Sequence, residues 1–439
     1  MNTVNHLVIV AGGKGERLAA MFGGVPKALV PLDGKPVLAH QLELAARCGV
    51  TSVTIFAGYL ADQISAFVGD GKHFGLHVDV RVESEPLGNA GAVLQSLSSL
   101  PERFFVMYGD VMLDVDLRRM ADTHIGHKAV FTAFVHPNDH PFDSDLVEAN
   151  AEGWVTALHN SPHAPGRVYD NLVNAALYVV ERDALRPFAE PSGKQDFTNG
   201  VMPGLIVSGA PVLAYRSTEY IKDMGTPERL ARVEMDLKSG KIHRQGKRDA
   251  AIFLDRDGTL NVEKGFLASQ DGLEIFPGSA SALKRLRQAG YRLVVVTNQP
   301  VIARGEASEE DVAAIHRRLG WELGKEGAYL DAIYICPHHP DRGFAGERPE
   351  FKIVCACRKP GTAMVEQACR DLGLDARTSW MIGDQTVDME LARRAGLRSI
   401  LVRTGFGGSD GRCNVTPDYV TDDLSAAADL ILEQMEVAA

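Results

Sequence analysis

The sequence predicts an α/β protein made of two doubly wound domains, and three observations support this fold class. At 439 residues the chain is too long for one ordinary core, so two domains of about 200 residues are expected. Short β-branched runs alternate with helical patterns throughout the chain. A polar, basic segment rich in helix breakers, DLKSGKIHRQGKRD, interrupts this rhythm, which restarts at Ala250. We therefore predict domains at 1–236 and 250–439, joined by a linker at 237–249.

The apolar runs of both halves are expected to be strands that carry functional residues at their carboxyl ends. In the first half, strands are expected at 6–13, 52–59, 78–85, 103–110 and 129–136. In the second half, they are expected at 251–258, 292–299, 332–339, 379–385 and 399–405. Helical stretches such as 36–49 and 279–290 each end at a glycine. Apolar strands that alternate with helices predict parallel sheets covered on both faces, and such sheets bind ligands beyond the carboxyl ends of their strands.

Composition narrows the function classes. The chain is 45% hydrophobic and 23% charged, as in soluble globular proteins. Its net charge of −11 disfavours non-specific nucleic-acid binding, and no apolar run approaches the roughly 20 residues of a membrane span. The start of the sequence lacks the features of a signal peptide, so we expect a cytoplasmic protein. We also expect its substrates to be small molecules and the protein to be either a monomer or a homo-oligomer. In a reducing compartment, paired cysteines suggest a metal before a disulfide.

The second half carries four groups of residues suited to phosphoryl chemistry. In IFLDRDGTLN, Asp255 and Asp257 follow a strand, where two carboxylates can share a divalent cation while one attacks phosphorus. Thr297 and Asn298 end another strand and offer hydrogen bonds to phosphate oxygens. The remaining groups are an acidic pair one helical turn apart, which suits Mg²⁺, and a lysine that could neutralise charge on phosphorus: Asp384, Asp388 and Lys359.

The same half contains a candidate metal site of another kind. Cys336 and His338 form one C-x-H pair, and Cys355 and Cys357 form a C-x-C pair, in a chain with only six cysteines. Three thiolates and an imidazole make a closed tetrahedral zinc set, so we expect a structural zinc. His339 is an alternative ligand to His338. The alternative to a metal site is a group of buried free cysteines beside a surface histidine.

The motifs DRDGTL, TNQ, RKP and GDQTVD, in this order, resemble the haloacid dehalogenase-like (HAD) phosphatases over about 180 residues. The resemblance implies that Asp255 is the nucleophile of an aspartyl-phosphate intermediate and that Asp257 is the general acid–base. It implies that Thr297 and Lys359 hold the phosphate. Asp384 would complete a Mg²⁺ site with Asp255 and the Asp257 carbonyl.

Within this superfamily, CPHHP and CACRKP resemble the zinc-containing branch of heptose bisphosphate and histidinol phosphatases. Sixteen residues separate His338 from Cys355, a long loop that favours the heptose-bisphosphate type over the histidinol type. The stretch TNQPVIARGEAS also resembles that type. Asn298, Arg304 and Arg358 are the substrate contacts that we expect here.

The first half begins with a strand and a glycine-rich loop, VIVAGGKGERL. Gly12, Gly13 and Gly15 would let backbone N–H groups approach a phosphate, and Arg17 could pair with a triphosphate. Lys27 is a second cation. A dinucleotide-binding turn would have a similar sequence. That fold, however, requires an acidic residue at the end of the second strand, where this chain has a glycine.

Further along the first half, two aspartates and a second glycine-rich loop complete a candidate nucleotide site. Asp110 ends a strand, and Asp223 lies in YIKDMGTPERL. Both could hold Mg²⁺ against a triphosphate while a sugar phosphate attacks the α-phosphorus. The loop at 85–91, which contains Gly88, could enclose a base or a sugar.

Together, AGGKGERL, PKALVP, EPLGNAG, YGD, NAALYV and DMGTPE resemble the sugar-1-phosphate nucleotidyltransferases, with their Rossmann-like, GT-A-like fold, over about 230 residues. The resemblance implies roles for the residues named above and adds Asn174 as a sugar contact. Gly12, Gly13 and Arg17 would cradle the triphosphate, and Gly88 would lie near the base or sugar. Ala176 stands where relatives often carry glycine.

The two resemblances fit one reaction sequence. A phosphatase fused to a sugar-1-phosphate nucleotidyltransferase should spare the anomeric phosphate, and removal of the 7-phosphate from heptose 1,7-bisphosphate leaves heptose 1-phosphate as the acceptor. The hypothesis is therefore a bifunctional enzyme of nucleotide-activated heptose synthesis for surface polysaccharide, with GTP favoured as the donor. One alternative is a mannose or glucose 1-phosphate nucleotidyltransferase fused to a histidinol-phosphatase-like enzyme. Another is a non-catalytic nucleotide-binding scaffold.

Overall fold

The structure is a computed structural model that describes residues 3–13, 21–150, 152–189, 193–240, 242 and 249–438. Its contacts divide the chain into two compact units. Unit 1 comprises Met1–His136, Asp143–His163 and Leu172–Gln245, and unit 2 comprises Pro137–Phe142, Ala164–Asn171 and Gly246–Ala439. Two short segments of the first half of the chain thus belong to unit 2. The alternation of strands and helices in the sequence gives no sign of this division.

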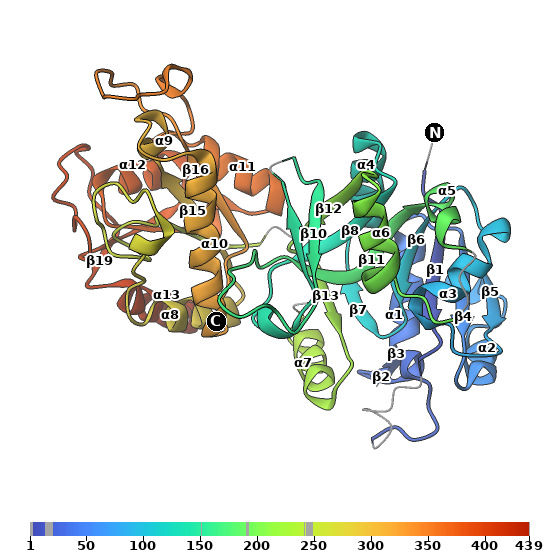
Figure 1. Ribbon diagram of the computed structural model, residues 1–439. Helices are drawn as coiled ribbons and strands as arrows, with labels where there is room; N and C mark the ends of the chain where they lie inside the picture. The colour runs from blue at the N-terminus through green and yellow to red at the C-terminus, as the bar shows by residue number, and fades with distance from the viewer. Residues whose placement is uncertain are drawn as a thin grey trace. The chain divides into compact units, whose positions relative to one another are not determined.

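Unit 1 is built on a nine-stranded mixed sheet (Figure 1). Its main path runs in the order β10-β9-β11-β6-β1-β4-β5, with β8 beside β11 and β12 beside β8. The strands are β1 (His6–Ala11), β4 (Ser52–Ala57), β5 (His77–Val82), β6 (Arg103–Tyr108), β8 (Phe131–His136), β9 (Leu146–Ala149), β10 (Val155–His159), β11 (Val173–Glu181) and β12 (Val212–Arg216). Successive strand residues point to opposite faces, so Leu7 and Ile9 enter one hydrophobic core and Val8 enters the other. The sheet is therefore covered on both faces, as predicted.

Helices supply the cover of the unit 1 sheet. The helices α1 (Val37–Arg47), α2 (Ala61–Val68) and α4 (Leu117–His127) contribute to one core, and α3 (Gly88–Gln95) and α6 (Met202–Val207) contribute to the other. The short strands β7 (Val111–Asp114) and β13 (Tyr220–Asp223) form a separate antiparallel pair, and β13 leads into α7 (Pro227–Lys238).

Strand β11 was not among the strands expected from the sequence, and it departs from the parallel arrangement that we predicted. The strands β5, β4, β1 and β6 are parallel, but β11 runs antiparallel to both β6 and β8. Its residues 177–180 are fully buried. A continuous apolar run indicates burial on both faces of a sheet and does not encode the direction of the strand.

Unit 2 contains a six-stranded sheet that is parallel throughout, in the order β16-β15-β14-β17-β18-β19. The strands are β14 (Ala251–Leu254), β15 (Arg292–Asn298), β16 (Ala332–Cys336), β17 (Trp380–Gly383), β18 (Arg398–Val402) and β19 (Tyr419–Thr421). Because β14 lies between β15 and β17, the carboxyl ends of these three strands meet at one edge of the sheet. The prediction of a doubly wound second domain is confirmed.

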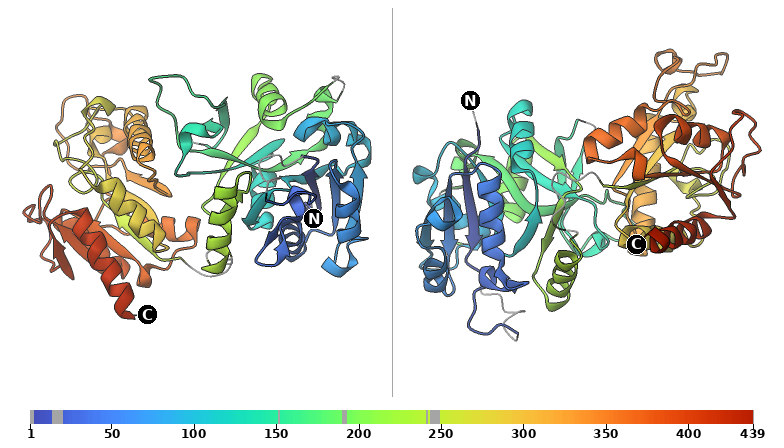
Figure 2. Two further views of the ribbon diagram at one scale, coloured as in Figure 1. Left: turned by 90° about the horizontal axis from the view of Figure 1, so that it is seen from below. Right: turned by 180° about the vertical axis from the view of Figure 1, so that it is seen from behind.

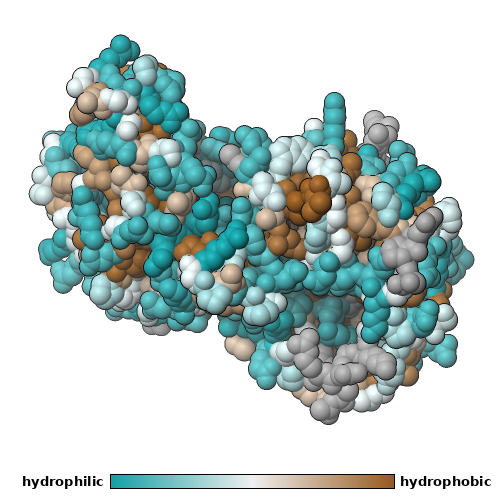
Figure 3. Space-filling model, viewed as in Figure 1, coloured by the Kyte–Doolittle hydropathy of each residue, from teal (hydrophilic) through white to brown (hydrophobic). Residues whose placement is uncertain are grey.

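Helices cover both faces of the unit 2 sheet. The helices α8 (Ser279–Gln288), α10 (Glu309–Lys325) and α13 (Leu424–Ala438) pack on one face, where α8 and α13 lie side by side (Figure 2). The helices α11 (Ala363–Leu372) and α12 (Thr386–Ala395) pack on the other. The face of the molecule in Figure 3 is mainly hydrophilic, with hydrophobic residues in small, separate patches. Among the described residues, no helix combines the length and the apolar character that crossing a membrane requires.

Candidate active sites and metal centre

Three carboxylates gather at the carboxyl edge of the unit 2 sheet. Asp255 follows β14, Asp384 follows β17, and Asp388 lies in the first turn of α12. One oxygen atom of each lies within 4.8 Å of the others. Asp255 is 5% exposed, and the other two residues are fully buried. Asp388 was predicted with Asp384 as an acidic pair that suits Mg²⁺, whereas the resemblance to HAD phosphatases implied only Asp384 of this pair as a ligand.

Lys359 pairs with two of the three carboxylates of this cluster. Its Nζ lies 2.8 Å from Asp255 Oδ1 and 2.7 Å from Asp388 Oδ1. Burial opposes the charged ammonium, but the two carboxylates raise the pKa of Lys359 above its ordinary value. Asn298 holds the lysine backbone at both ends, because its Oδ1 accepts from the Lys359 N–H (2.9 Å) and its Nδ2 donates to the Lys359 carbonyl (3.3 Å). The amide of Asn298, predicted to contact substrate, is thus engaged with the backbone.

When its three carboxylates are ionised, the cluster carries more negative than positive charge. Three carboxylates face one ammonium, and burial together with the charges of Asp255 and Asp388 raises the pKa of Asp384 to about 8. Burial also raises the pKa of Asp388 to about 7, although Lys359 opposes the rise. Asp384 Oδ1 has no hydrogen-bond partner among the described residues. Buried carboxylate oxygens with excess negative charge fit a hard divalent cation such as Mg²⁺.

Two glycines leave room for Asp384. A Cβ atom at Gly258 or at Gly405 would lie 2.2 Å from Asp384 Oδ2, closer than any real contact. Both residues also have positive φ angles, of 83° and 60°, which glycine adopts without strain. The loops after β14 and β18 therefore approach the cluster more closely than a side chain would permit.

The Asp257 side chain lies outside the acidic cluster. Arg256 donates to it from Nε (3.0 Å) and from Nη2 (2.5 Å), and Asn261 and Gln299 donate to it as well. Burial alone would raise the pKa of Asp257, but the Arg256 charge and these hydrogen bonds hold it below its ordinary value. Among the side chains, the third carboxylate of the cluster is therefore that of Asp388. The sequence-derived proposal gave Asp257 a backbone carbonyl contact with the metal, and that proposal stays untested.

Three further predicted residues of unit 2 have distinct surroundings. Thr297 is 1% exposed at the end of β15, where its hydroxyl accepts from Gln299 Nε2 (2.8 Å). The Arg304 guanidinium stacks against Phe266 and Phe344, at 3.8 and 4.3 Å from the ring centroids. Arg358 Nη1 donates to the carbonyl of His338 (3.1 Å), beside the cysteine cluster. The three residues thus have different partners, and none of these contacts tests their predicted substrate roles.

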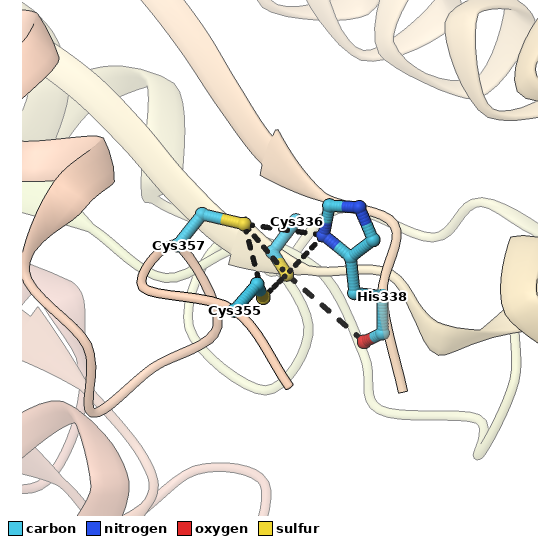
Figure 4. A group of neighbouring side chains, drawn as sticks. All are labelled: Cys336, His338, Cys355 and Cys357. Carbon is cyan, nitrogen blue, oxygen red and sulfur yellow. Dashed lines mark hydrogen bonds between the residues drawn. The ribbon is translucent and has the colours of Figure 1, made fainter. Parts of the chain in front are cut away.

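The second metal candidate is assembled as predicted (Figure 4). One ligand atom from each of Cys336, His338, Cys355 and Cys357 lies within 4.8 Å of the others. The Cys357 sulfur lies 3.2 Å from the Cys355 sulfur, 3.3 Å from the Cys336 sulfur and 3.2 Å from His338 Nδ1, and the Cys336 and Cys355 sulfurs are 3.6 Å apart. A tetrahedral zinc with sulfur ligands at about 2.3 Å separates those ligands by about 3.8 Å, close to these values. The four donors can hold a metal ion.

The structure distinguishes the two candidate histidines. His338 directs Nδ1 into the cysteine cluster (Figure 4). His339 instead accepts a hydrogen bond at Nδ1 from the Asp341 backbone (3.2 Å) and has a ring contact with Phe344. His338 is therefore the residue placed to complete the set.

In unit 1, the two predicted magnesium ligands lie on neighbouring backbone segments. The Met224 N–H donates to the Asp110 carbonyl (3.0 Å), and Asp223 pairs with Val111 across the short β7–β13 ladder. Lys27 forms an ion pair with Asp110. Arg229, which we did not single out in the sequence, donates from Nη1 to both oxygens of Asp223 (2.8 and 2.9 Å).

The electrostatics of Asp223 depend on these cations. Burial opposes ionisation, but Arg229 and, more weakly, Lys27 hold the pKa of Asp223 below its ordinary value. The sequence stretch DMGTPERL places Arg229 six residues after Asp223, in the first turn of α7. A single sequence gives no reason to prefer it over the other arginines.

Gly12 and Gly88 of unit 1 lie where another residue comes close to the glycine backbone. Gly12 and Gly13 follow β1, and a Cβ at Gly12 would lie 2.8 Å from a carboxylate oxygen of Glu83. Gly88 has a φ of 82°, and a Cβ there would lie 2.2 Å from the carbonyl of Gln195. Gly15 and Arg17 lie outside the described residues.

The predicted sugar contact lies at an irregularity of β11. Asn174 Nδ2 donates to Tyr178 Oη (3.0 Å) and to Thr198 Oγ1 (3.1 Å). The pairing of β11 with β8 shifts register between Asn174 and Tyr178, and Ala176 adopts a φ of 55° there. Glycine adopts this left-handed conformation more easily than alanine does, which explains why glycine is frequent at this place in related motifs.

Comparisons with known proteins identify the families of the two halves. Residues 6–240 match the family described as Nucleotidyl transferase, and residues 356–427 match the family described as HAD-hydrolase-like. A D-glycero-beta-D-manno-heptose-1,7-bisphosphate 7-phosphatase of Yersinia pestis is 40% identical over 186 residues, which are 42% of this chain and 90% of that protein. The enzyme of the same name from Escherichia coli K12 is 39% identical over 189 residues, or 43% of this chain and 96% of that protein.

Among solved structures, HddC from Yersinia pseudotuberculosis is similar to this chain, with 22% identity and a TM-score of 0.46, over 53% of this chain and all of that one. The family match covers more than half of the chain, and the phosphatase relatives are covered almost completely. The chain therefore belongs to the nucleotidyl transferase family in its first half and to the family of these HAD-type phosphatases in its second, and it is a fusion of a nucleotidyltransferase with a phosphatase.

Proposed function

We propose that the two halves catalyse successive steps in the synthesis of a nucleotide-activated heptose. Unit 2 removes the 7-phosphate of D-glycero-D-manno-heptose 1,7-bisphosphate. Unit 1 then transfers a nucleotidyl group, from GTP, to the resulting heptose 1-phosphate and releases pyrophosphate. The observation that carries this proposal is the buried cluster of Asp255, Asp384, Asp388 and Lys359 in a half-chain that is about 40% identical to enzymes named heptose-1,7-bisphosphate 7-phosphatases.

The chemistry of the phosphatase step follows from the positions of these residues. Asp255, held beside Lys359, attacks the 7-phosphorus, and the bond from phosphorus to the sugar oxygen breaks. In its protonated form Asp257 donates a proton to that oxygen, and the resulting carboxylate then takes a proton from the water that releases phosphate from the aspartyl-phosphate. Lys359 contacts the nucleophile directly and is placed to neutralise charge on the phosphoryl oxygens.

Two different metals complete the proposal. Asp255 and Asp384, with Asp388 nearby, would hold Mg²⁺, which when bound offsets the negative charge of the transferring phosphoryl group. Cys336, His338, Cys355 and Cys357 would hold a structural Zn²⁺. The Arg358 N–H donates to the Cys355 sulfur (3.4 Å), so the zinc site would fix the backbone directly before Lys359. A reducing cytoplasm, where thiolates stay free to bind metal, suits this site.

Unit 1 supplies the second step. Gly12, Gly13 and the loop at 85–91 would receive the nucleotide, while Asp110 and Asp223 would hold Mg²⁺ together with the triphosphate. GTP is proposed because EPLGNAG resembles the guanylyltransferases that act on heptose 1-phosphate. The order of reactions follows from the chemistry, since the second step requires the anomeric phosphate that the first step leaves intact.

One incubation tests both steps. Purified protein is given heptose 1,7-bisphosphate with Mg²⁺ and one nucleoside triphosphate at a time, and products are identified by mass. The names of the relatives specify the β anomer, so α- and β-bisphosphates are assayed separately. We expect one equivalent of phosphate, one of pyrophosphate and a GDP-heptose.

The outcomes separate the alternatives. Phosphate release followed by an ADP-heptose would retain the pathway and correct the donor. No phosphate release from either anomer would remove the proposed substrate, and mannose 1-phosphate, glucose 1-phosphate and histidinol phosphate would then be assayed. Nucleotide binding without any turnover would indicate a scaffold.

A further inference from the structure

Arg256, the residue between the two catalytic aspartates, is fully buried. A charged guanidinium is rarely removed from water unless its donors are satisfied. The Arg256 side chain donates twice to Asp257, once to Gln299 Oε1 (3.0 Å) and once to His316 Nε2 (3.0 Å). Its orientation is therefore fixed by partners from three parts of the chain.

Asp257 receives four hydrogen bonds in this arrangement. Its Oδ1 accepts from Arg256 Nε (3.0 Å) and Asn261 Nδ2 (2.9 Å), and its Oδ2 accepts from Arg256 Nη2 (2.5 Å) and Gln299 Nε2 (3.0 Å). A carboxylate offers about four acceptor sites, and all four are used here. The oxygen that takes up a proton must therefore first release one of its two partners. Asn261 and Gln299 are neutral donors with one bond each. Arg256 makes two parallel bonds, so it is the partner that can keep the carboxylate in place.

His316 supports Arg256 from the opposite side. It lies on α10, about 60 residues away in sequence from the catalytic aspartates (Figure 1). A guanidinium can only donate, so His316 Nε2 must accept and must therefore carry no proton. Burial and the Arg256 charge lower the pKa of His316 to about 3, which keeps the ring neutral. No hydrogen bond among the described residues joins either aspartate to this histidine, so its hydrogen-bonded connection to Asp257 runs through Arg256.

We propose that Arg256 and His316 are positioning residues that hold the Asp257 carboxylate where it exchanges a proton with the leaving sugar oxygen. This inference rests on the proposed phosphatase function and extends it to a residue on a remote helix. A carboxylate without a fixed partner would sample several rotamers, and general acid–base catalysis is sensitive to such misplacement.

The test compares two substitutions of His316. His316→Phe removes the acceptor and keeps a ring, whereas His316→Gln keeps an acceptor oxygen. With heptose bisphosphate, we expect His316→Phe to lower kcat at least about tenfold, part of the roughly 100- to 10,000-fold that general acid–base catalysis contributes, with KM unchanged. His316→Gln should recover most of the loss. Melting temperatures and zinc content report whether each variant is folded.

A second substrate distinguishes positioning from general damage. Acetyl phosphate has a leaving group that needs little protonation, so first-turnover release of acetate should fall much less in His316→Phe than first-turnover release of the sugar. Equal losses on both substrates, or a folded His316→Phe enzyme with wild-type kcat on the bisphosphate, would overturn the positioning role while leaving the proposed function intact. Failure of the wild-type protein to hydrolyse the bisphosphate would overturn the proposed function, and this inference with it.

Discussion

The acidic residues of the two units are held in opposite ways. In unit 2, the side chains of Asp255 and Asp388 are 7% and 0% exposed and share one lysine. In unit 1, the side chains of Asp110 and Asp223 are 25% and 43% exposed, and each has its own cation, Lys27 or Arg229. Negative charge is therefore concentrated in the unit 2 site, whereas in the unit 1 site each carboxylate is compensated by a cation.

The difference indicates how each unit would acquire its metal. A buried cluster with excess negative charge can bind Mg²⁺ before substrate arrives, because the ion replaces protons that the burial would otherwise demand. Two half-exposed carboxylates that already have partners bind Mg²⁺ weakly alone, and such sites usually take the ion together with substrate phosphates. We therefore expect a resident metal in unit 2 and a substrate-delivered metal in unit 1.

The largest expected effect separates the two reactions completely. Asp255→Asn removes the proposed nucleophile, so phosphate release should fall at least about a thousandfold, because removal of a covalent nucleophile eliminates the main route of reaction. Nucleotidyl transfer to a supplied sugar 1-phosphate should be unchanged.

Asp110→Asn is the matched control and should give the reverse result. Loss of both activities in either variant would mean that the two sites are not independent, and the comparison would fail.

The second effect concerns the stability of unit 2. Replacing Cys357 by alanine removes one of the four proposed metal ligands, and loss of a structural metal site is expected to cost about 3–5 kcal/mol of unfolding free energy. Denaturant unfolding with a probe in each unit measures the effect, together with zinc content. Cys413→Ala, in the same unit and outside the cluster, is the control. Equal zinc content in the Cys357 variant and the wild-type protein would contradict the assigned ligand set.

The third effect is a pH dependence that Mg²⁺ should remove. The raised pKa values of Asp384 (about 8) and Asp388 (about 7) mean that folding of the metal-free protein takes up protons. Their contribution to stability is complete below the ordinary carboxyl pKa of about 4 and is lost as pH rises through 7 to 8. Because Mg²⁺ competes with these protons, the increase in melting temperature that it causes should be larger near pH 8 than near pH 6.

Asp388→Asn should weaken this pH dependence in the absence of nucleotide. An equal Mg²⁺-induced increase in melting temperature at both pH values would indicate that the carboxylates of the cluster are already ionised. The electrostatic argument for a resident metal in unit 2 would then fail. Asp223 has the opposite sign, since its lowered pKa gives stability that is present above the ordinary carboxyl pKa and lost as pH falls.

The smallest effect concerns Arg229. Its pair with Asp223 is more than a third exposed on both sides, so Arg229→Gln should change the unfolding free energy of unit 1 by only about 0.2–1 kcal/mol. Thermal unfolding measures this change, with Arg232→Gln on the same helix as the control. A loss of several kcal/mol of unfolding free energy would show that the pair stabilises the fold of unit 1. The difference between the acidic residues of the two units would then be smaller than we infer.

Particular residues show how far the sequence could predict the sites. Asp255 and Asp384 were located correctly because each follows an apolar run that could only be a strand, and parallel strands end at one edge of a sheet. The sequence spacing of Cys336, His338, Cys355 and Cys357 was enough to predict that these four side chains meet, and the structure brings them together, but their role as zinc ligands stays a prediction. Strand β11 was not among the expected strands, and the mixed character of the unit 1 sheet was not predicted, because strand direction depends on partners that are distant in sequence.

The sequence by itself determined the class of each half, the strand ends that carry carboxylates, and the donors of the metal centre, because these features lie in short stretches of adjacent residues. Only the tertiary structure decided which charges meet. The contacts of Lys359 with Asp255 and Asp388, and of His316 with Arg256, join segments between 29 and 104 residues apart in sequence. Electrostatic interactions depend on distance in space and on burial, and a linear sequence records neither.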